Sequence, residues 1–353
     1  MALTGTTFFF VLVVATVIAM IGTVAVWSMV RGPRPVRWLT HGVMIAVCQL
    51  TAISVVATWI NNSYGLYASW DDLLGRTDAA NAEAMPGPPP SRAQFNHGTR
   101  GGMLDTYFRG GRSTLSGQVL VWTPPQYDDP AYRKKKFPVV FLLHGVPGSP
   151  QSWLERGGIP GDYEDLLKQR KTNPFILVMP VIDPGSVDTD CSDLPHRKVA
   201  TWLAYDVPDL VRQKFRTVPG PRGMGLMGFS TGGYCAAKLP LQYPKVFAAG
   251  AAIDPDPLTG DPSVLRDPAV RRANAPTELV ARSKAPVSLF LATSRQDRLS
   301  PPSSIEKFLT AAGPSTVQVR TQLLSSGGHN FHTFAASYPM AFHWLSTWLS
   351  GPR

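Results

Sequence analysis

The chain has 353 residues, 16% of them charged, and a formal net charge of +10, so it is long enough for one large domain with additional segments. A positive net charge indicates a nucleic-acid-binding protein only where the basic residues form a focused patch. The basic run at residues 133–136 directly precedes an apolar stretch. We therefore expect a solvated loop there and no nucleic-acid partner, with contact to anionic lipid or a cell-surface polymer as the alternative.

Two long apolar runs come first along the chain. Residues 1–30 contain no charged side chain, and residues 38–60 contain no Asp, Glu, Lys or Arg and a single histidine, His41. We expect transmembrane helices at about 7–30 and 38–60, within a segment of residues 1–70. A cleaved signal peptide is the alternative for the first run, which lacks a basic n-region. The connector at residues 31–37 holds three arginines and no acid, so the positive-inside rule places it in the cytoplasm and the rest of the chain outside.

Residues 71–100 are rich in Ala, Pro, Gly and Asn, which predicts a linker stiffened by polyproline geometry. Beyond the linker, we expect one α/β domain at residues 101–353. The alternating pattern at residues 116–123 is typical of a strand at an exposed antiparallel edge.

Strands and helices are then expected to alternate. Further strands are predicted at residues 138–143, 175–179, 224–227, 246–253, 287–293 and 317–324. Helices are predicted at residues 161–170, 199–215, 233–243, 302–312 and 334–349. This alternation predicts a mostly parallel sheet with helices on both faces, and ligands bind such sheets beyond the carboxyl ends of the strands.

The loop after the strand at residues 138–143 has the sequence HGVPG. Such a loop can supply a backbone donor to the oxyanion that develops during acyl transfer. Pro147 has no N–H group, so we expect the donor to be Val146, with Gly145 as the alternative. His144 is expected to brace the loop.

The pentapeptide GFSTG at residues 228–232 lies between a strand-like and a helix-like run. G-x-S-x-G in that position is the pattern of a nucleophile elbow, a strained turn on which the serine is exposed. The glycines are needed there because a Cβ atom would clash in so sharp a bend. Ser230 is therefore the candidate nucleophile, and the N–H of Thr231 is the other candidate oxyanion donor. The alternative is a Gly/Ser turn in an ordinary α/β domain.

A serine hydroxyl needs a base to act as a nucleophile at neutral pH. His329 follows the last predicted strand in a glycine-rich loop that can bring the imidazole over Ser230, and His332 is its rival. Asp297 follows the strand at residues 287–293 and is the expected carboxylate that orients the imidazole. Glu306, inside a predicted helix, is the next candidate. The order Ser230, Asp297, His329 is the order found in the α/β-hydrolase fold.

The chain has three cysteines. Cys48 lies in the second apolar run and is expected to be a small packing residue. Cys191 lies in a polar loop and Cys235 on the helix after Ser230. We expect these two to pair, because an extracytoplasmic domain permits a disulfide; two free thiols are the alternative. No Cys/His spacing indicates a metal site, and we expect no cofactor.

Taken together, residues 105–350 resemble the esterase D-like branch of the α/β-hydrolases, which includes S-formylglutathione hydrolases, feruloyl esterases and mycolyltransferases. The resemblance is carried by the segments VVFLLHGVPGSPQSW, PFILVMPVIDPG, GFSTGGYCAAKLPLQYPKVFAAGAAIDP and GGHNFHTFAASYPMAFHWL. It implies a triad of Ser230, Asp297 and His329 with an oxyanion hole at Thr231 and Val146. The mycolyltransferases typically have a glutamate as the triad acid, and the simple secreted members lack the two apolar helices. A membrane-tethered subgroup of actinobacterial esterases is more similar.

The sequence thus predicts a serine esterase anchored in the plasma membrane, with its catalytic domain extracytoplasmic and an acyl-enzyme formed on Ser230. The alternative is a mycolyltransferase-like acyltransferase that delivers the acyl chain to a sugar or lipid hydroxyl of the cell envelope. A non-catalytic envelope-binding module on the same fold is the third hypothesis. The expected partners are an acyl ester, or an envelope lipid or glycolipid, and the membrane.

Overall fold

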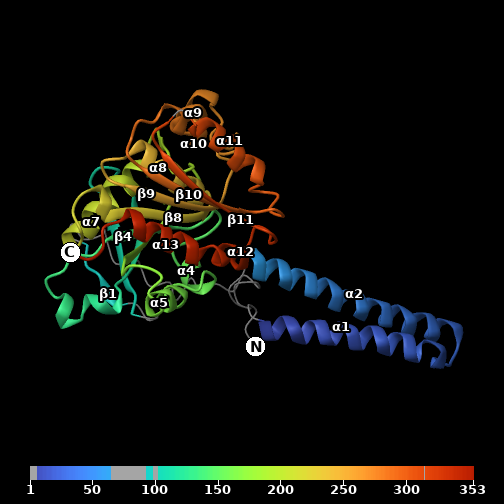
Figure 1. Ribbon diagram of the computed structural model, residues 1–353. Coiled ribbons are helices and arrows are strands. Elements are labelled where there is room, and N and C mark those ends of the chain that lie inside the picture. Colours follow the sequence, from blue (N-terminus) through green and yellow to red (C-terminus); the bar gives the residue numbers. More distant parts are fainter. Residues whose placement is uncertain (1–5, 65–92, 98–101, 314) are drawn as a thin grey trace. The chain divides into compact units, whose positions relative to one another are not determined.

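The computed structural model describes residues 6–64, 93–97, 102–313 and 315–353 (Figure 1). The chain divides into two compact units, Met1–Pro86 and Gly87–Arg353. The linker predicted at residues 71–100 lies outside the described residues, apart from residues 93–97.

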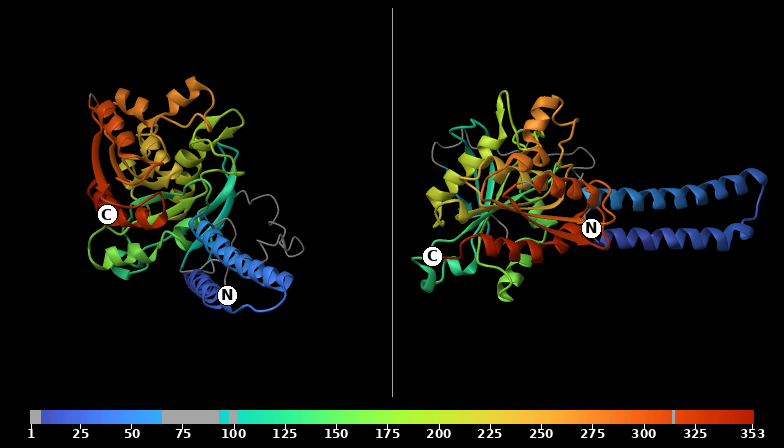
Figure 2. Two further views of the ribbon diagram at one scale, coloured as in Figure 1. Left: turned by 90° about the vertical axis from the view of Figure 1, so that its right-hand side faces the viewer. Right: turned by 45° about the horizontal axis from the view of Figure 1, so that its top comes forward.

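The first unit contains two apolar helices, α1 (Thr6–Val26) and α2 (Arg34–Tyr64). They lie side by side as an antiparallel pair in both views of Figure 2. Where they meet, Thr23 Oγ1 lies 3.2 Å from Cys48 Sγ, which agrees with a packing role for this cysteine. The apolar stretches of the two helices have mean hydropathies of 2.7 and 2.1, and both are long enough to cross a bilayer.

The described part of the second unit is built on a nine-stranded sheet in the order β1-β2-β3-β5-β4-β8-β9-β10-β11. The six strands from β5 to β11 in this order are parallel, whereas β1, β2 and β3 join the sheet by antiparallel pairing. The strand bounds are Asn96–His97 (β1), Leu104–Arg109 (β2), Ser116–Trp122 (β3), Val139–Leu143 (β4), Ile176–Pro180 (β5), Met224–Ser230 (β8), Ala249–Pro255 (β9), Ser288–Ser294 (β10) and Gln318–Leu324 (β11). A separate small hairpin consists of β6 (Asp193–Leu194) and β7 (Arg197–Lys198).

Helices cover both faces of the sheet (Figure 1). Their bounds are Ser152–Glu155 (α4), Gly161–Lys168 (α5), Val199–Thr201 (α6), Val207–Lys214 (α7), Thr231–Gln242 (α8), Pro268–Asn274 (α9), Pro276–Arg282 (α10), Pro302–Ala312 (α11), Phe331–Ala336 (α12) and Tyr338–Trp348 (α13). The period of two along each strand divides the core between the faces. In β4, Phe141 packs in one cluster with residues of α7 and α8, whereas Leu142 packs in another with residues of α5 and α13. The predicted α/β-hydrolase architecture, a mostly parallel sheet between two helical layers, is confirmed.

The structure corrects two details of the sequence-based assignment. The strand β3 is antiparallel as expected but does not lie at the edge of the sheet, because β2 pairs with its outer side. The last four residues of β3 are buried. The alternating sequence pattern therefore predicted a more exposed strand than the structure shows. The helix predicted at residues 334–349 is divided at Ser337 into α12 and α13.

Glycine at position 250 lets helix α8 approach strand β9. A Cβ atom there would lie 2.0 Å from the backbone oxygen of Ala236, so helix or strand would have to move. We expect Gly250→Ala to lower the free energy of unfolding by about 1–3 kcal/mol. Denaturant unfolding of the detergent-solubilised chain, followed by tryptophan fluorescence, measures this change.

Gly161 is the matched control. A Cβ atom at Gly161, the first residue of α5, would have nothing within 4 Å, so Gly161→Ala should leave stability unchanged or raise it by up to about 1 kcal/mol. An equal effect of the two substitutions would contradict the close approach of α8 to β9.

Candidate active site

Ser230 occupies a strained turn between β8 and α8. It is the last residue of β8 and has φ 55° and ψ −127°, a conformation that costs a non-glycine residue energy and is common at functional sites. The glycines on either side permit it. A Cβ atom at Gly228 would lie 2.2 Å from the oxygen of Gly232, and one at Gly232 would lie 2.1 Å from the oxygen of Leu143. The turn has the geometry of a nucleophile elbow.

His329 connects Ser230 to Asp297. Its Nε2 atom lies 2.9 Å from Ser230 Oγ, and its Nδ1 atom lies 2.8 Å from Asp297 Oδ2. The other carboxylate oxygen of Asp297 accepts hydrogen bonds from the N–H groups of Leu299 and Ser300, at 2.8 and 2.9 Å. The Asp297 side chain is fully buried, whereas that of His329 is 17% exposed. The three side chains therefore form a hydrogen-bonded chain from the interior to the molecular surface.

The two rival residues lie elsewhere. His332 is exposed on α12, and Glu306 is exposed on α11. Of the candidates raised by the sequence, the structure brings together Ser230, Asp297 and His329.

Burial and neighbouring charges shift the pKa values of His329 and Asp297. Burial by itself would lower the pKa of His329, but its hydrogen bond to Asp297, with the nearby charges of Asp297, Asp256 and Asp254, raises that pKa above its ordinary value. Burial would raise the pKa of Asp297, but the hydrogen bonds from His329 and from the N–H of Ser300 lower it below its ordinary value. Asp297 is thus held as a carboxylate, the form that stabilises an imidazolium.

The two predicted oxyanion donors belong to segments that lie next to the nucleophile. Thr231 is the first residue of α8, and the N–H groups of a helix's first turn have no acceptor within the helix. The loop after β4 lies against the elbow, because a Cβ atom at Gly145 would be 3.1 Å from Ser230 Cβ. Val146 follows in this loop and is joined to Pro147 by a cis peptide bond. The choice of Val146 over Gly145 as second donor remains a prediction.

His144 braces the loop after β4. The side chain is buried, and burial lowers its pKa to about 4, so it is neutral at physiological pH. Its Nδ1 lies 2.8 Å from the oxygen of Gly145, and its Nε2 accepts the N–H of Ile182 at 3.2 Å. This pairing assigns the proton to Nδ1, and it ties the loop after β4 to the segment after β5.

Two further carboxylates lie at the end of β9, next to the candidate triad. Asp256 Oδ1 accepts the hydroxyl of Ser230 at 3.1 Å, and its Oδ2 accepts that of Thr231 at 2.6 Å. Asp254 is buried and has φ 40°. Burial and the neighbouring Asp297 raise the pKa of Asp254 to about 7.

Sequence reasoning missed both of these residues. The available signal was their position at the end of the strand that follows the nucleophile helix. That signal identifies site residues only once β9 is known to lie beside β8, since the carboxyl ends of adjacent parallel strands share one edge.

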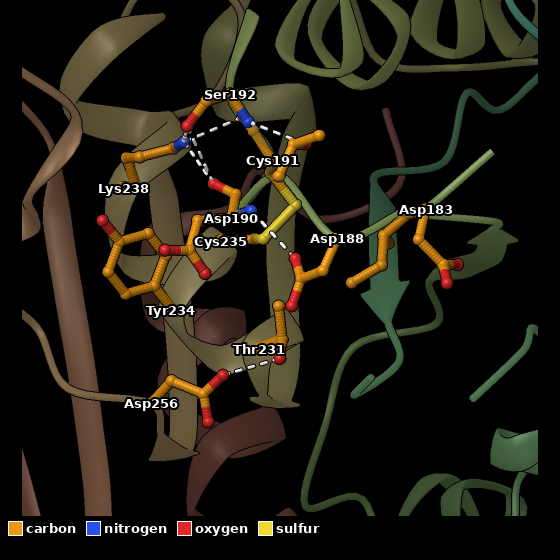
Figure 3. The surroundings of a disulfide bond; sticks show 12 residues. Asp183, Asp188, Asp190, Cys191, Ser192, Thr231, Tyr234, Cys235, Lys238 and Asp256 are labelled. Atoms are coloured by element: carbon orange, nitrogen blue, oxygen red, sulfur yellow. Dashed lines mark hydrogen bonds between the residues drawn. A yellow bond between two sulfur atoms is a disulfide. The ribbon is translucent and has the colours of Figure 1, made fainter. Parts of the chain in front are cut away.

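The disulfide expected between Cys191 and Cys235 is present. It joins the loop before β6 to helix α8 (Figure 3). Beside it the buried Lys238 donates hydrogen bonds to the backbone oxygens of Asp190 and Cys191 and to Ser192 Oγ. Burial lowers the pKa of Lys238 and raises that of Asp190, and their mutual attraction opposes both shifts. A covalent bond and a buried cation thus attach this loop to the helix that begins beside the nucleophile.

Across the described residues, no group of three or more His, Cys, Asp or Glu side chains is arranged to hold a metal ion.

We expect the imidazole of His329 to titrate above pH 6.5, the ordinary value, because of its acidic neighbours. Protonation of His329 should therefore increase the free energy of unfolding. This contribution is fully present below pH 6.5 and is lost as the pH rises through the raised pKa of His329. Asp297→Asn removes the negative charge that contacts His329 directly and should lower the midpoint of the His329 titration. Imidazole NMR spectra recorded across the pH range measure both midpoints.

His332→Gln is the control, since His332 is exposed on α12; it should leave the His329 midpoint unchanged. A wild-type midpoint at or below 6.5, or one that Asp297→Asn does not lower, would contradict the hydrogen-bonded chain described above.

Known proteins that resemble this chain are esterases and an uncharacterised relative. An uncharacterised protein of Corynebacterium glutamicum is 26% identical over 249 residues, which are 65% of this chain and 56% of the relative. Feruloyl esterase B of Thermothelomyces thermophilus is 30% identical over 139 residues, 38% of this chain and 42% of that protein. The chain therefore spans about half the length of the curated relatives it matches.

Solved structures share the fold. A ferulic acid esterase superposes with a TM-score of 0.60 at 20% identity, over 69% of this chain and 98% of the other. An S-formylglutathione hydrolase from Agrobacterium tumefaciens superposes with a TM-score of 0.58 at 18% identity, over 73% and 99%. The family model described as "Putative esterase" matches residues 116–345, which include the elbow, the histidine loop and most of the sheet. More than half of the chain is thus covered, and the protein belongs to this esterase family.

Proposed function

We propose that this protein is a membrane-anchored serine esterase that cleaves acyl esters through an acyl-enzyme on Ser230. The observation that carries the proposal is the unbroken hydrogen-bonded chain from Asp297 through His329 to Ser230, at a turn with the strained geometry of a nucleophile elbow. Membership of an esterase family supports a carboxylic ester hydrolase. We assign roles to individual residues on the basis of this geometry.

Acylation begins with the serine hydroxyl. As Ser230 Oγ bonds to the ester carbonyl carbon, its proton passes to His329 Nε2, which lies 2.9 Å away, and the imidazole becomes positively charged. Asp297, bonded to Nδ1, stabilises that charge and holds the ring in the productive orientation. The imidazolium then gives the proton to the leaving alcohol oxygen as the carbon–oxygen bond breaks, which leaves the acyl group on Ser230.

The tetrahedral intermediate carries its negative charge on the former carbonyl oxygen. Fixed backbone donors stabilise such an oxyanion, and losing one typically costs about 10²–10³-fold in rate. We assign this role to the N–H groups of Thr231 and Val146, which lie on the two segments that adjoin Ser230. Water then attacks the acyl-enzyme, with His329 accepting its proton, and releases the acid.

The anchor is proposed from α1 and α2, whose length and hydropathy suit a bilayer. The arginines in the connector at residues 31–37 favour its cytoplasmic location. With two spans, the esterase domain is then extracytoplasmic. This location agrees with the disulfide between Cys191 and Cys235, since disulfides persist in oxidising compartments.

Ser230→Ala should abolish labelling by a fluorophosphonate and reduce ester hydrolysis by at least about 10³-fold, because no other group replaces the nucleophile. Asp297→Asn should reduce kcat/KM by on the order of 10³–10⁴-fold while the protein stays folded. Hydrolysis of 4-nitrophenyl esters of increasing acyl length measures both, and circular dichroism checks the fold.

A wild-type protein that is folded but neither labelled nor active would overturn the proposal and would favour a non-catalytic module. Product analysis with excess sugar or alcohol present separates the two acyl acceptors. Free acid as the main product supports hydrolysis, whereas a new ester would show that an alcohol replaces water in the second step.

A membrane-impermeant fluorophosphonate should label Ser230 in intact cells to the same extent as in lysed cells, because the esterase domain faces outward. Ser230→Ala supplies the unlabelled control. Labelling that appears only after lysis would place the domain in the cytoplasm and overturn the proposed topology, without bearing on the chemistry.

A further inference from the structure

Asp256 contacts the nucleophile although it is not part of the Ser–His–Asp chain. Its backbone N–H donates to the oxygen of Ser230 at 3.2 Å, and its carboxylate accepts the hydroxyls of Ser230 and Thr231. It lies between Pro255 and Pro257, whose rings restrict the backbone. Figure 3 shows the carboxylate turned toward Thr231. The carboxylate is thus built into the elbow.

The hydroxyl of Ser230 has two acceptors but only one proton. His329 Nε2 lies 2.9 Å from Oγ, and Asp256 Oδ1 lies 3.1 Å away. Attack on an ester sends the proton to His329, and the acylated oxygen then has no proton to donate. From that step onward Asp256 Oδ1 no longer accepts a hydrogen bond from Ser230. A partly buried carboxylate oxygen without a hydrogen-bond donor is stabilised by a new donor or by a cation placed next to it.

The protein does not neutralise this charge. Within the described residues, no lysine or arginine forms an ion pair with Asp256. Lys238, the buried cation in Figure 3, donates instead to Ser192 and to backbone oxygens of the loop. Asp188 in that loop adds a like charge, since its carboxylate and that of Asp256 repel each other. Asp256 and Asp188 therefore both add negative charge near the nucleophile.

We propose that Asp256 is a specificity-determining residue that selects substrates by charge. It favours esters that carry an ammonium-type cation close to the scissile carbonyl over neutral esters of the same shape, and it disfavours anionic esters. A cation there offsets the repulsion between the carboxylate and the developing oxyanion, whereas a second anion increases it. This inference rests on the proposed function, in which Ser230 is the nucleophile.

Three esters of one acyl group test it. Their alcohols are choline, its neutral isostere 3,3-dimethylbutanol, and an alcohol of the same length that ends in a carboxylate; the acyl group is the one cleaved fastest as a 4-nitrophenyl ester. For wild type we expect kcat/KM to fall about tenfold from cationic to neutral and about tenfold again to anionic. Both ratios should shrink at high salt. Acid release in a pH-stat measures all three.

Asp256→Asn should bring both ratios close to one, whatever its effect on the absolute rates. Each ratio compares two esters hydrolysed by the same variant, so a loss of activity that affects all esters equally leaves the ratio unchanged. Asp256→Glu keeps the charge and should keep the order of preference, and Asp256→Ser serves as a second neutral variant if the asparagine variant fails to fold. Glu278→Gln removes the same charge from an exposed position on α10 and should retain the wild-type ratios.

Equal ratios in wild type and Asp256→Asn, or a wild-type preference for the anionic ester, would overturn the inference. Labelling of Ser230 by a neutral fluorophosphonate distinguishes failure of the charge-selection inference from failure of the proposed esterase function. A labelled wild type that hydrolyses all three esters equally fast overturns charge selection alone. An unlabelled and inactive wild type overturns the esterase assignment, and the inference with it.

Discussion

Helix α8 lies so close to the sheet that side chains cannot fit between them at several points. A Cβ atom at Gly228, Gly232 or Gly250 would lie within 2.2 Å of a backbone oxygen, a separation that atoms in real structures do not reach. This approach makes the turn at Ser230 sharp and forces a positive φ on a residue that is not glycine. The strain is tolerated because packing on both sides fixes the turn, and as a result the hydroxyl is presented at the edge of the sheet.

Charge is organised around that hydroxyl. Asp297 lies behind the imidazole of His329, and Asp256 lies beside the serine. These carboxylates favour the protonated form of the imidazole, and the raised pKa of His329 reflects them. The same charges act on whatever enters the site, so one arrangement sets both the basicity of His329 and the electrostatic environment beside Ser230.

Much of the fold could be predicted from sequence because parallel, fully buried strands are continuous apolar runs. The residues of β4, β5 and β10 are all buried. The predicted first and last residues of these strands differ from the observed ones by no more than one position. The helices α9 and α10, between β9 and β10, were not predicted. Each has only seven residues, and α9 has no buried residue, so neither shows a clear apolar period.

The sequence by itself determined the elbow, the order of the three candidate residues and the apolar helices, because each depends on local spacing or composition. Only the tertiary structure decided that His329 rather than His332 meets Ser230, since His329 lies in the loop before α12 whereas His332, three positions later, is exposed on that helix. Only it placed Asp254 and Asp256 beside the site. Their role depends on β9 lying next to β8, and the pairing of strands is set by contacts between segments far apart in the chain.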